Sequence, residues 1–86
     1  MSVAVTLYGA PGCHLCDDAK EVLDRQRELL GFELEVVDIS DDSELEARYR
    51  EEIPVVLVAG RKAFKYRVDP AELARRVVLA SQASDF

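Results

Sequence analysis

The sequence lacks an excess of basic residues: 11 lysines and arginines stand against 17 aspartates and glutamates, for a formal net charge of −6. Proteins that bind a nucleic-acid backbone need a basic surface to neutralise phosphates, so we expect no nucleic-acid partner. No apolar run approaches the roughly 20 residues that a membrane-spanning helix needs, and we expect no membrane association. The first residues, MSVAVTLY, show neither the basic segment nor the cleavage site of a signal peptide. The sequence therefore predicts a cytoplasmic protein.

Tryptophan is absent, and the chain has only two cysteines and one histidine. A structural zinc site usually takes four ligands from two separated pairs, whereas here the histidine lies between the cysteines in Cys13-His14-Leu15-Cys16. We therefore expect no metal site, although a metal centre shared between two copies of the chain stays open. A disulfide that closes so short a loop restricts the unfolded chain little. In a cytoplasmic protein, this C-x-x-C pair thus favours a redox couple.

Internal repeats, low-complexity tracts and linker-like stretches are also absent, and 86 residues suffice for one small domain. We therefore expect a single domain over residues 1–86. Apolar periodicity and end signals predict its elements. They are a strand over 3–8, a helix from about 15 that Gly31 ends, a strand over 32–36, a helix opened by a capping box at Ser43–Glu46 and ending near Arg50 or Glu51, a strand over 53–58, a turn at 59–61, a strand over 64–68, and a helix opened by Asp69 and Pro70. This order predicts an α/β fold with a mixed sheet.

Cys13 falls where the first strand and its GAPG turn meet the long helix. A helix N-terminus carries unpaired amides and the positive end of the helix dipole, and both stabilise a thiolate. We expect Cys13 to be the exposed attacking thiol. Cys16 lies one turn deeper on the same helical face and is expected to resolve the mixed disulfide.

Charged neighbours are expected to temper this thiolate. Asp17, Asp18 and Glu21 complement the dipole in the first two turns of the helix, but their negative charge opposes thiolate formation at Cys13. His14 points about 100° away from Cys13 around the helix, so we expect a weak influence and no role as a general base.

These motifs carry a family resemblance. The sequence resembles the glutaredoxin-like branch of the thioredoxin superfamily over almost the whole chain. The resemblance rests on the first strand, PGCHLC, the long helix, IPVV, the glycine hairpin and the last helix. YGAPGCHLC is similar to small bacterial glutaredoxin-like proteins with a C-H-L-C motif. The resemblance implies a thioredoxin-like βαβαββα fold, a four-stranded mixed sheet flanked by three helices. It also implies a cis Pro54, with the backbone of Ile53 opposite the cysteines and paired with an extended substrate segment. The expected substrate-binding residues are Ile53, Pro54, Gly12 and His14.

Glutaredoxins that use glutathione typically carry a lysine shortly before the first cysteine, a Thr-Val-Pro segment, and a Gly-Gly-x-x-Asp stretch after the hairpin. Here residues 8–12 include no basic residue, Glu52-Ile53-Pro54 stands at the second motif, and YRVDPAE stands where the glycines would be. The glutathione-binding determinants are thus largely absent. We expect no cofactor, and the use of glutathione as a substrate stays open.

Two functions follow from these observations. The first is a thiol-disulfide oxidoreductase in which Cys13 attacks and Cys16 resolves. Its expected partners are a disulfide-containing protein or a small thiol, together with an unidentified reductant, and we expect a monomer. The second is a thioredoxin-like module that binds a protein through its Ile53-Pro54 surface while the cysteines stay redox-silent.

Overall fold

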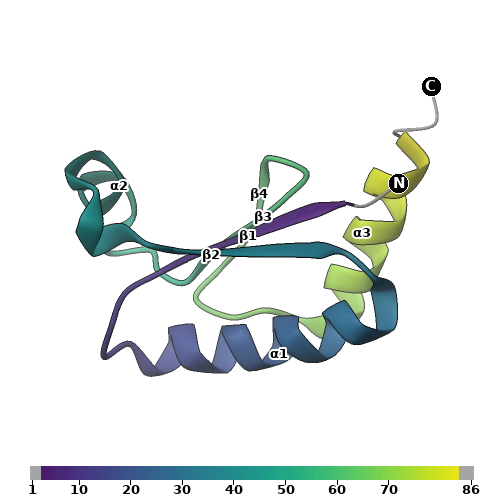
Figure 1. Cartoon of the computed structure of the whole chain (residues 1–86), viewed down its shortest axis with the longest axis horizontal. Coiled ribbons are helices and arrows are strands. Elements are labelled where there is room, and N and C mark those ends of the chain that lie inside the picture. Colours follow the sequence, from purple (N-terminus) through teal and green to yellow (C-terminus); the bar gives the residue numbers. More distant parts are fainter. Residues whose placement is uncertain (1–2, 84–86) are drawn as a thin grey trace.

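A computed structural model describes residues 3–83 of the chain, and these form the expected βαβαββα order. The elements are β1 (Ala4–Gly9), α1 (His14–Leu30), β2 (Glu33–Asp38), the 3-10 helix η1 (Ile39–Asp41), α2 (Ser43–Tyr49), β3 (Val55–Val58), β4 (Arg61–Lys65) and α3 (Pro70–Ala83). Figure 1 shows α1 running along the sheet, with α2 and α3 at opposite ends of the molecule. The predicted mixed four-stranded sheet with three α-helices is confirmed. No helix within 3–83 combines the length and apolar character needed to cross a membrane.

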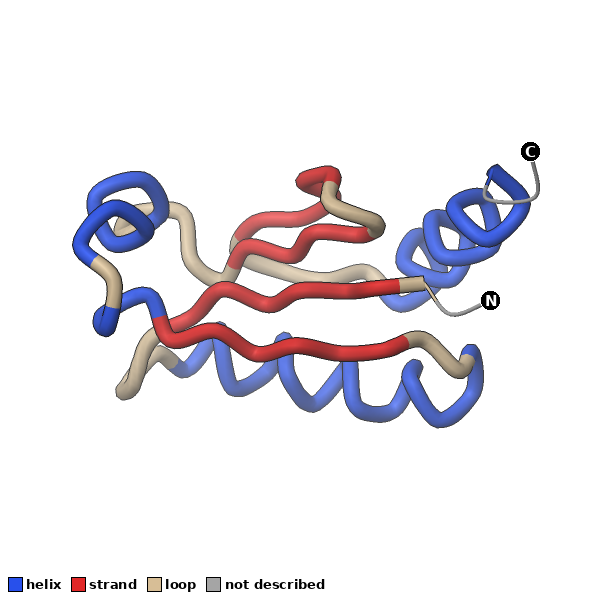
Figure 2. Tube along the Cα trace, turned by 45° about the horizontal axis from the view of Figure 1, so that its top comes forward, coloured by secondary structure: helices blue, strands red, loops and turns tan. Residues whose placement is uncertain are grey.

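The sheet has the strand order β2-β1-β3-β4, which Figure 2 shows as neighbouring red tubes. β1 and β2 are parallel and are joined by α1, whereas β3 is antiparallel to both β1 and β4. Tyr8 near the end of β1 is paired with Val55 at the start of β3. The segment that follows Gly9 and the segment that ends at Pro54 therefore leave the sheet at the same end.

The core lies between the sheet and the pair of helices α1 and α3. Its buried residues are Val3, Val5, Leu7, Ala19, Leu23, Phe32, Val56, Val58, Leu73 and Val77. In β1, Val5 and Leu7 are buried while Ala4 and Thr6 are more exposed, which is the period of two that a strand imposes. Leu23 of α1 is fully buried, and burial of a leucine side chain contributes roughly 1.5–3 kcal/mol. This packing holds α1, and hence its N-terminus, against the sheet.

Two helix ends follow their predicted signals. Gly31 ends α1 in the left-handed conformation, with a φ of 75°, and its N–H donates to the carbonyl oxygen of Arg27 at 2.8 Å. The Asp69 carboxylate accepts a hydrogen bond from the N–H of Ala71 at 3.0 Å, directly before Pro70 opens α3. Residues 1–2 and 84–86, which the single-domain prediction includes, lie outside the described residues.

The predicted cap of α2 is wrong by one residue. Asp42 is the N-cap, and its carboxylate accepts hydrogen bonds from the N–H groups of Glu44 and Leu45 at 2.9 and 3.2 Å. Ser43, the expected cap, is already the first helical residue. Aspartate and serine are almost equally good caps, so residue type alone does not decide between neighbours.

The predicted fourth strand is also displaced. The alternation of Phe64, Tyr66 and Val68 favoured a strand over 64–68, but β4 spans Arg61–Lys65. Tyr66 leaves the sheet with a φ of 70°, which no regular strand contains. The backbone conformation of a single residue therefore ends the strand within an alternating pattern.

Candidate functional site

The two cysteines lie where β1 turns into α1. Gly12 has a φ of 77°, a left-handed conformation that glycine adopts without steric cost. The next residue, Cys13, is the N-cap of α1 and has an extended backbone with φ −95° and ψ 109°. Its Sγ atom accepts a hydrogen bond from the backbone N–H of Cys16 at 3.1 Å. The sulfur thus occupies the place of the side-chain oxygen that usually caps a helix.

Cys13 and Cys16 form a disulfide, and their Cα atoms lie 5.2 Å apart. The two residues differ in exposure: Cys13 is half-buried, whereas Cys16 is buried at 6% exposure. Thiol–disulfide exchange requires direct access of one sulfur to another. Cys13 is therefore the cysteine of the pair with more exposure to solvent.

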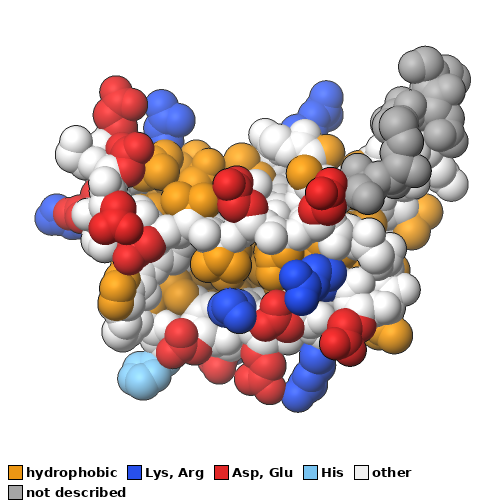
Figure 3. Space-filling model, viewed as in Figure 1, with side chains coloured by type: hydrophobic (Ala, Val, Ile, Leu, Met, Phe, Trp, Pro, Cys, Tyr) orange, Lys and Arg blue, Asp and Glu red, His pale blue; other side chains and the backbone are white. Residues whose placement is uncertain are grey.

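Charges around the N-terminus of α1 act in opposite directions. In the reduced protein, the N–H of Cys16 and the helix dipole favour a negative sulfur at Cys13. Asp17 in the first turn and Asp18 beside it are exposed and carry negative charge. His14 is exposed to solvent and is the pale-blue side chain in Figure 3, with acidic side chains near it. The solvent around these groups weakens the influence of each charge on the sulfur.

The buried sulfur has its own surroundings. The backbone of Gly9 lies against Cys16, and a cavity of about 200 Å³ opens beside them between β1, β2 and α1. Its lining includes Pro11 from the turn, Val36 and Asp38 from β2, and Lys20 from α1. This hollow leaves space next to the internal sulfur.

The other expected binding residues lie in the segment between α2 and β3. The Ile53–Pro54 peptide bond is cis, Pro54 is buried and Ile53 is half-buried. The N–H of Ile53 already donates to the carbonyl oxygen of Tyr49 at 3.1 Å. The Ile53 carbonyl oxygen, in contrast, accepts none of the backbone hydrogen bonds found in turns and loops of residues 3–83. On Ile53, the N–H is thus engaged within the chain, whereas the carbonyl oxygen takes no part in those hydrogen bonds.

The register of β1 and β3 brings the cysteine turn and the cis-proline to the same end of the sheet. This end of the sheet thus holds two segments, one with Gly12, Cys13 and His14 and one with Ile53 and Pro54. Across the described chain, however, no hydrogen bond joins either cysteine to Ile53 or Pro54. Five of the six expected site residues thus lie at one end of the sheet, in two segments that these hydrogen bonds do not link.

Aromatic and charged side chains tie the end of α2 to the sheet. The rings of Tyr8 and Tyr49 are stacked, with centroids 4.9 Å apart. The Nζ atom of Lys62 lies 2.6 Å from Oε1 of Glu52 and 5.7 Å from the centroid of the Tyr49 ring. The hydrogen bond from Lys62 holds the pKa of the Glu52 carboxyl below its usual value. Lys62 thus helps to hold the segment that leads to Ile53.

Sequence reasoning missed two residues that shape this region, Gly9 and Tyr66. Gly9 was identified only as the start of the turn that closes the first strand, whereas it is the last residue of β1, and Tyr66 was assigned to a strand that it in fact leaves. A glycine directly before the cysteine turn was an available signal for close packing, but nothing in residue type marks Tyr66. Among the described residues, no group of three or more His, Cys, Asp or Glu side chains is placed to hold a metal ion.

Comparisons with known proteins agree with this geometry. The sequence matches the family model of the glutaredoxin-like domain (DUF836) over residues 4–78. It is 26% identical over 78 residues to the glutaredoxin-like protein YDR286C homolog of Dictyostelium discoideum, covering 84% of this chain and 72% of that protein. The solved structure of protein XcR50 from X. campestris is 33% identical, with a TM-score of 0.70 over 90% of this chain and 96% of that one.

Thioredoxin 1 from Thermosipho africanus TCF52B is only 12% identical, but its structure matches with a TM-score of 0.66 over 96% of this chain and 99% of its own. At such low identity, the match concerns the fold. The chain thus has a thioredoxin-like fold, and the pair of cysteines at the start of α1 suits a redox function. Because the family model covers most of the sequence, the chain belongs to the glutaredoxin-like domain (DUF836) family.

Proposed function

We propose that the protein is a thiol-disulfide oxidoreductase that works through the Cys13–Cys16 couple. One observation carries the proposal: the two sulfurs form a disulfide at the N-terminus of α1, and Cys13 is more exposed to solvent than the buried Cys16. A reactive cysteine needs access and an environment that stabilises its thiolate. Cys13 has both, from its exposure and from the N–H of Cys16.

The exchange starts from the reduced dithiol. The Cys13 thiolate attacks one sulfur of a substrate disulfide, so that a mixed disulfide forms while the substrate S–S bond breaks and its first thiolate leaves and takes up a proton. Cys16 then loses its proton and attacks the Sγ atom of Cys13. The internal disulfide forms, the second substrate thiol leaves, and two electrons have passed from the protein to the substrate. A reductant with its own thiols returns the protein to the dithiol by the same exchange.

The partners of this reaction are a disulfide-containing protein or a small thiol compound and a reductant that is still to be identified. We propose that the protein acts as a cytoplasmic monomer without a cofactor. Two features of the sequence argue against a dedicated glutathione site. Residues 8–12 include no basic residue, and Glu52-Ile53-Pro54 stands where glutathione-using glutaredoxins typically have Thr-Val-Pro. The exchange itself needs no group beyond the two cysteines.

The proposal is tested by incubating the reduced protein with insulin, a protein disulfide, and following its reduction. Wild type should reduce insulin, and Cys13→Ser should abolish the reaction. Cys16→Ser should stop at the mixed disulfide on Cys13, which gel electrophoresis without reductant detects. Inactive wild-type protein, or equal reduction by Cys13→Ser, would refute the proposal.

The alternative is a redox-silent module that binds proteins through the Ile53-Pro54 surface. Titration of the cysteine pair in a redox buffer separates the two functions. A midpoint between roughly −200 and −270 mV, where cytosolic thiol oxidoreductases work, supports the oxidoreductase. A pair that stays oxidised far below this range supports the binding module.

A further inference from the structure

Tyr66 has an unusual backbone conformation. Its φ is 70°, in the left-handed region where a side chain with a Cβ atom crowds the backbone. The N–H of Arg67 donates to the carbonyl oxygen of Lys65 at 2.8 Å, so Tyr66 is the central residue of a γ-turn of the rarer, strained form. Such a conformation persists only where surrounding contacts hold it, and it is common at binding sites.

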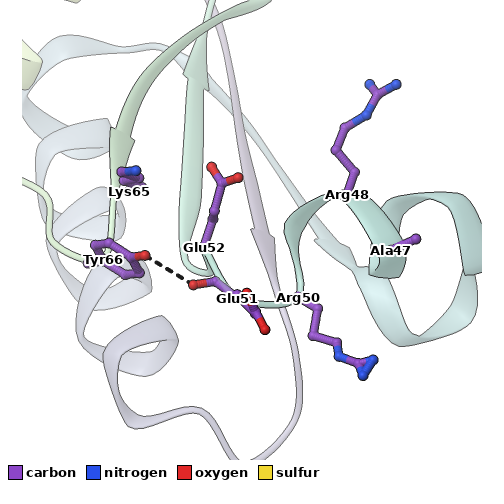
Figure 4. Close-up of a pocket in the computed structure, with 7 residues that line it drawn as sticks. All are labelled: Ala47, Arg48, Arg50, Glu51, Glu52, Lys65 and Tyr66. Atoms are coloured by element: carbon purple, nitrogen blue, oxygen red, sulfur yellow. Dashed lines mark hydrogen bonds between the residues drawn. The ribbon is translucent and has the colours of Figure 1, made fainter.

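Two hydrogen bonds connect Tyr66 to the cis-proline segment. Its backbone N–H donates to the carbonyl oxygen of Pro54 at 2.8 Å. Its phenolic O–H donates to the carbonyl oxygen of Glu51 at 3.1 Å, which is the dashed line in Figure 4. The main chain of Tyr66 thus holds one end of the segment 51–54, and its side chain holds the other end. Ile53 lies between these two attachment points.

Tyr66 also lines two hollows of the surface. A cavity of about 450 Å³ between α2 and β4 is lined by Tyr66 together with Glu51, Glu52 and Lys65, which Figure 4 shows. A second cavity of about 210 Å³ is lined by Tyr66 and by residues of α1 and of the loop before α3, among them Leu15. Tyr66 is 44% exposed and therefore forms part of the surface that a bound molecule would touch. The second cavity extends this surface toward α1, the helix that carries both cysteines.

We propose that Tyr66 is a positioning residue for protein substrates of the cysteine pair: it fixes the backbone of Ile53 in the geometry that accepts an extended peptide. The inference rests on the proposed function, because it concerns the substrate of the same site. The N–H of Ile53 is bonded to Tyr49, so an added strand depends on the carbonyl oxygen, whose direction is set by the segment that Tyr66 holds. The substrate class is a protein or peptide disulfide with an extended backbone, rather than a small disulfide without one.

The test compares two substrates with different needs. Insulin has a peptide backbone to pair with Ile53, whereas dithiobis(nitrobenzoate) has a disulfide but no backbone. Tyr66→Phe removes only the hydrogen bond to Glu51 and should raise the KM for insulin by about three- to ten-fold, the range expected for one lost hydrogen bond. The kcat for insulin and the reaction with dithiobis(nitrobenzoate) should stay unchanged. Tyr8→Phe removes a hydroxyl from another tyrosine and should change neither substrate's kinetics.

A second variant, Tyr66→Gly, controls for the possibility that a substitution at this position disturbs the fold. Glycine adopts positive φ freely, so Tyr66→Gly keeps the turn while it removes the ring and its hydrogen bond. It should raise the KM for insulin at least as much as Tyr66→Phe and leave the melting temperature near that of wild type. Equal losses on both substrates, or an unchanged KM for insulin in both variants, would overturn the positioning role.

A binding measurement tests the role of Tyr66 independently of the proposed oxidoreductase activity. In the Cys13→Ser background no exchange occurs, and the affinity for insulin can be followed by titration. Adding Tyr66→Phe to this background should weaken binding by the same factor as it raises the KM. Undetectable binding, or an affinity that Tyr66→Phe leaves unchanged, overturns the inference even if the wild-type protein reduces both disulfides.

Discussion

A Cβ atom added at Gly9 would lie 3.2 Å from both the Cβ and the Sγ atoms of Cys16. This is closer than side-chain carbons normally approach, so the bare backbone of Gly9 forms the wall against which the buried cysteine packs. Gly9 ends β1 and is itself buried. The strand that leads into the cysteine turn thus also limits the space around its internal sulfur.

Gly9→Ala should therefore displace Cys16 and destabilise the oxidised protein by about 1–3 kcal/mol, as overpacking in a core does. The reduced sulfur is free to rotate away from the added methyl group, whereas the sulfur in the disulfide is tied to Cys13. The midpoint of the pair should accordingly become less negative. Urea denaturation of the oxidised protein and titration in a redox buffer measure the two effects.

Gly31→Ala provides the matched control, because it adds the same methyl group at a site remote from the cysteines. A Cβ at Gly31 meets no atom within 4 Å, but its φ of 75° strains any side chain. The expected loss of stability is about 1 kcal/mol, with no change in the midpoint. A midpoint shift of equal size in both variants would contradict the special role of Gly9.

Periodicity and end signals suffice to predict the order of elements here. Gly31 and the Asp69-Pro70 pair mark helix ends whose backbone geometry depends on their own residue type. The cysteine pair was placed correctly at the start of α1 for the same reason, since it follows a strand and a glycine turn directly. Signals that act within a few residues can be read from the sequence.

Other features depend on residues that are distant in the sequence. Tyrosine prefers strands, and Tyr66 sits in an alternating pattern, yet its hydrogen bonds to Glu51 and Pro54 hold it in a left-handed turn. Gly9 and Cys16 are closer in the sequence, but their contact also arises only when the turn between them brings the start of α1 back against the end of β1. No periodicity encodes such pairs. The parts of the candidate site that were missed are those that tertiary packing creates.

The cap of α2 offers a direct test of one correction. Asp42→Ala removes the carboxylate that accepts the N–H groups of Glu44 and Leu45, and it should cost about 1 kcal/mol of stability at neutral pH. Ser43→Ala should cost clearly less, because Ser43 is the first helical residue and its side chain is not the cap. Urea denaturation curves of both variants decide the matter, and a larger loss with Ser43→Ala would restore the capping box that the sequence predicted.

Acid should remove the contribution of Glu72 to stability. Hydrogen bonds from Arg75 and Arg76 lower the pKa of the Glu72 carboxyl from 4.5 to about 2. The folded-state pKa is thus below the unfolded value, so this stabilisation is fully present above about pH 4.5 and is lost as the pH falls toward 2. The Glu72 carboxylate is partly open to solvent, which screens its ion pairs, so its contribution to the free energy of unfolding is small.

Glu72→Gln should therefore lower the urea midpoint slightly at pH 7, and the difference from wild type should disappear at pH values near the folded-state pKa. Glu28→Gln, on the exposed surface of α1, is a suitable control because it removes the same charge away from Arg75 and Arg76. A difference between wild type and Glu72→Gln that persists unchanged in acid would show that the carboxylate charge is not its source.

The charge of Asp17 should restrain the reactivity of Cys13. Asp17 lies in the first turn of α1, where its negative charge repels a thiolate at Cys13 that the helix dipole and the N–H of Cys16 favour. In the reduced protein, Asp17→Asn should speed the alkylation of Cys13 by iodoacetamide by about two- to five-fold at neutral pH and low salt, the range expected for one exposed charge near a helix end. The gain should shrink as salt screens the charge. Glu28→Gln changes the net charge equally at the other end of α1, so a similar gain in that variant would trace the effect to overall charge rather than to the position of Asp17.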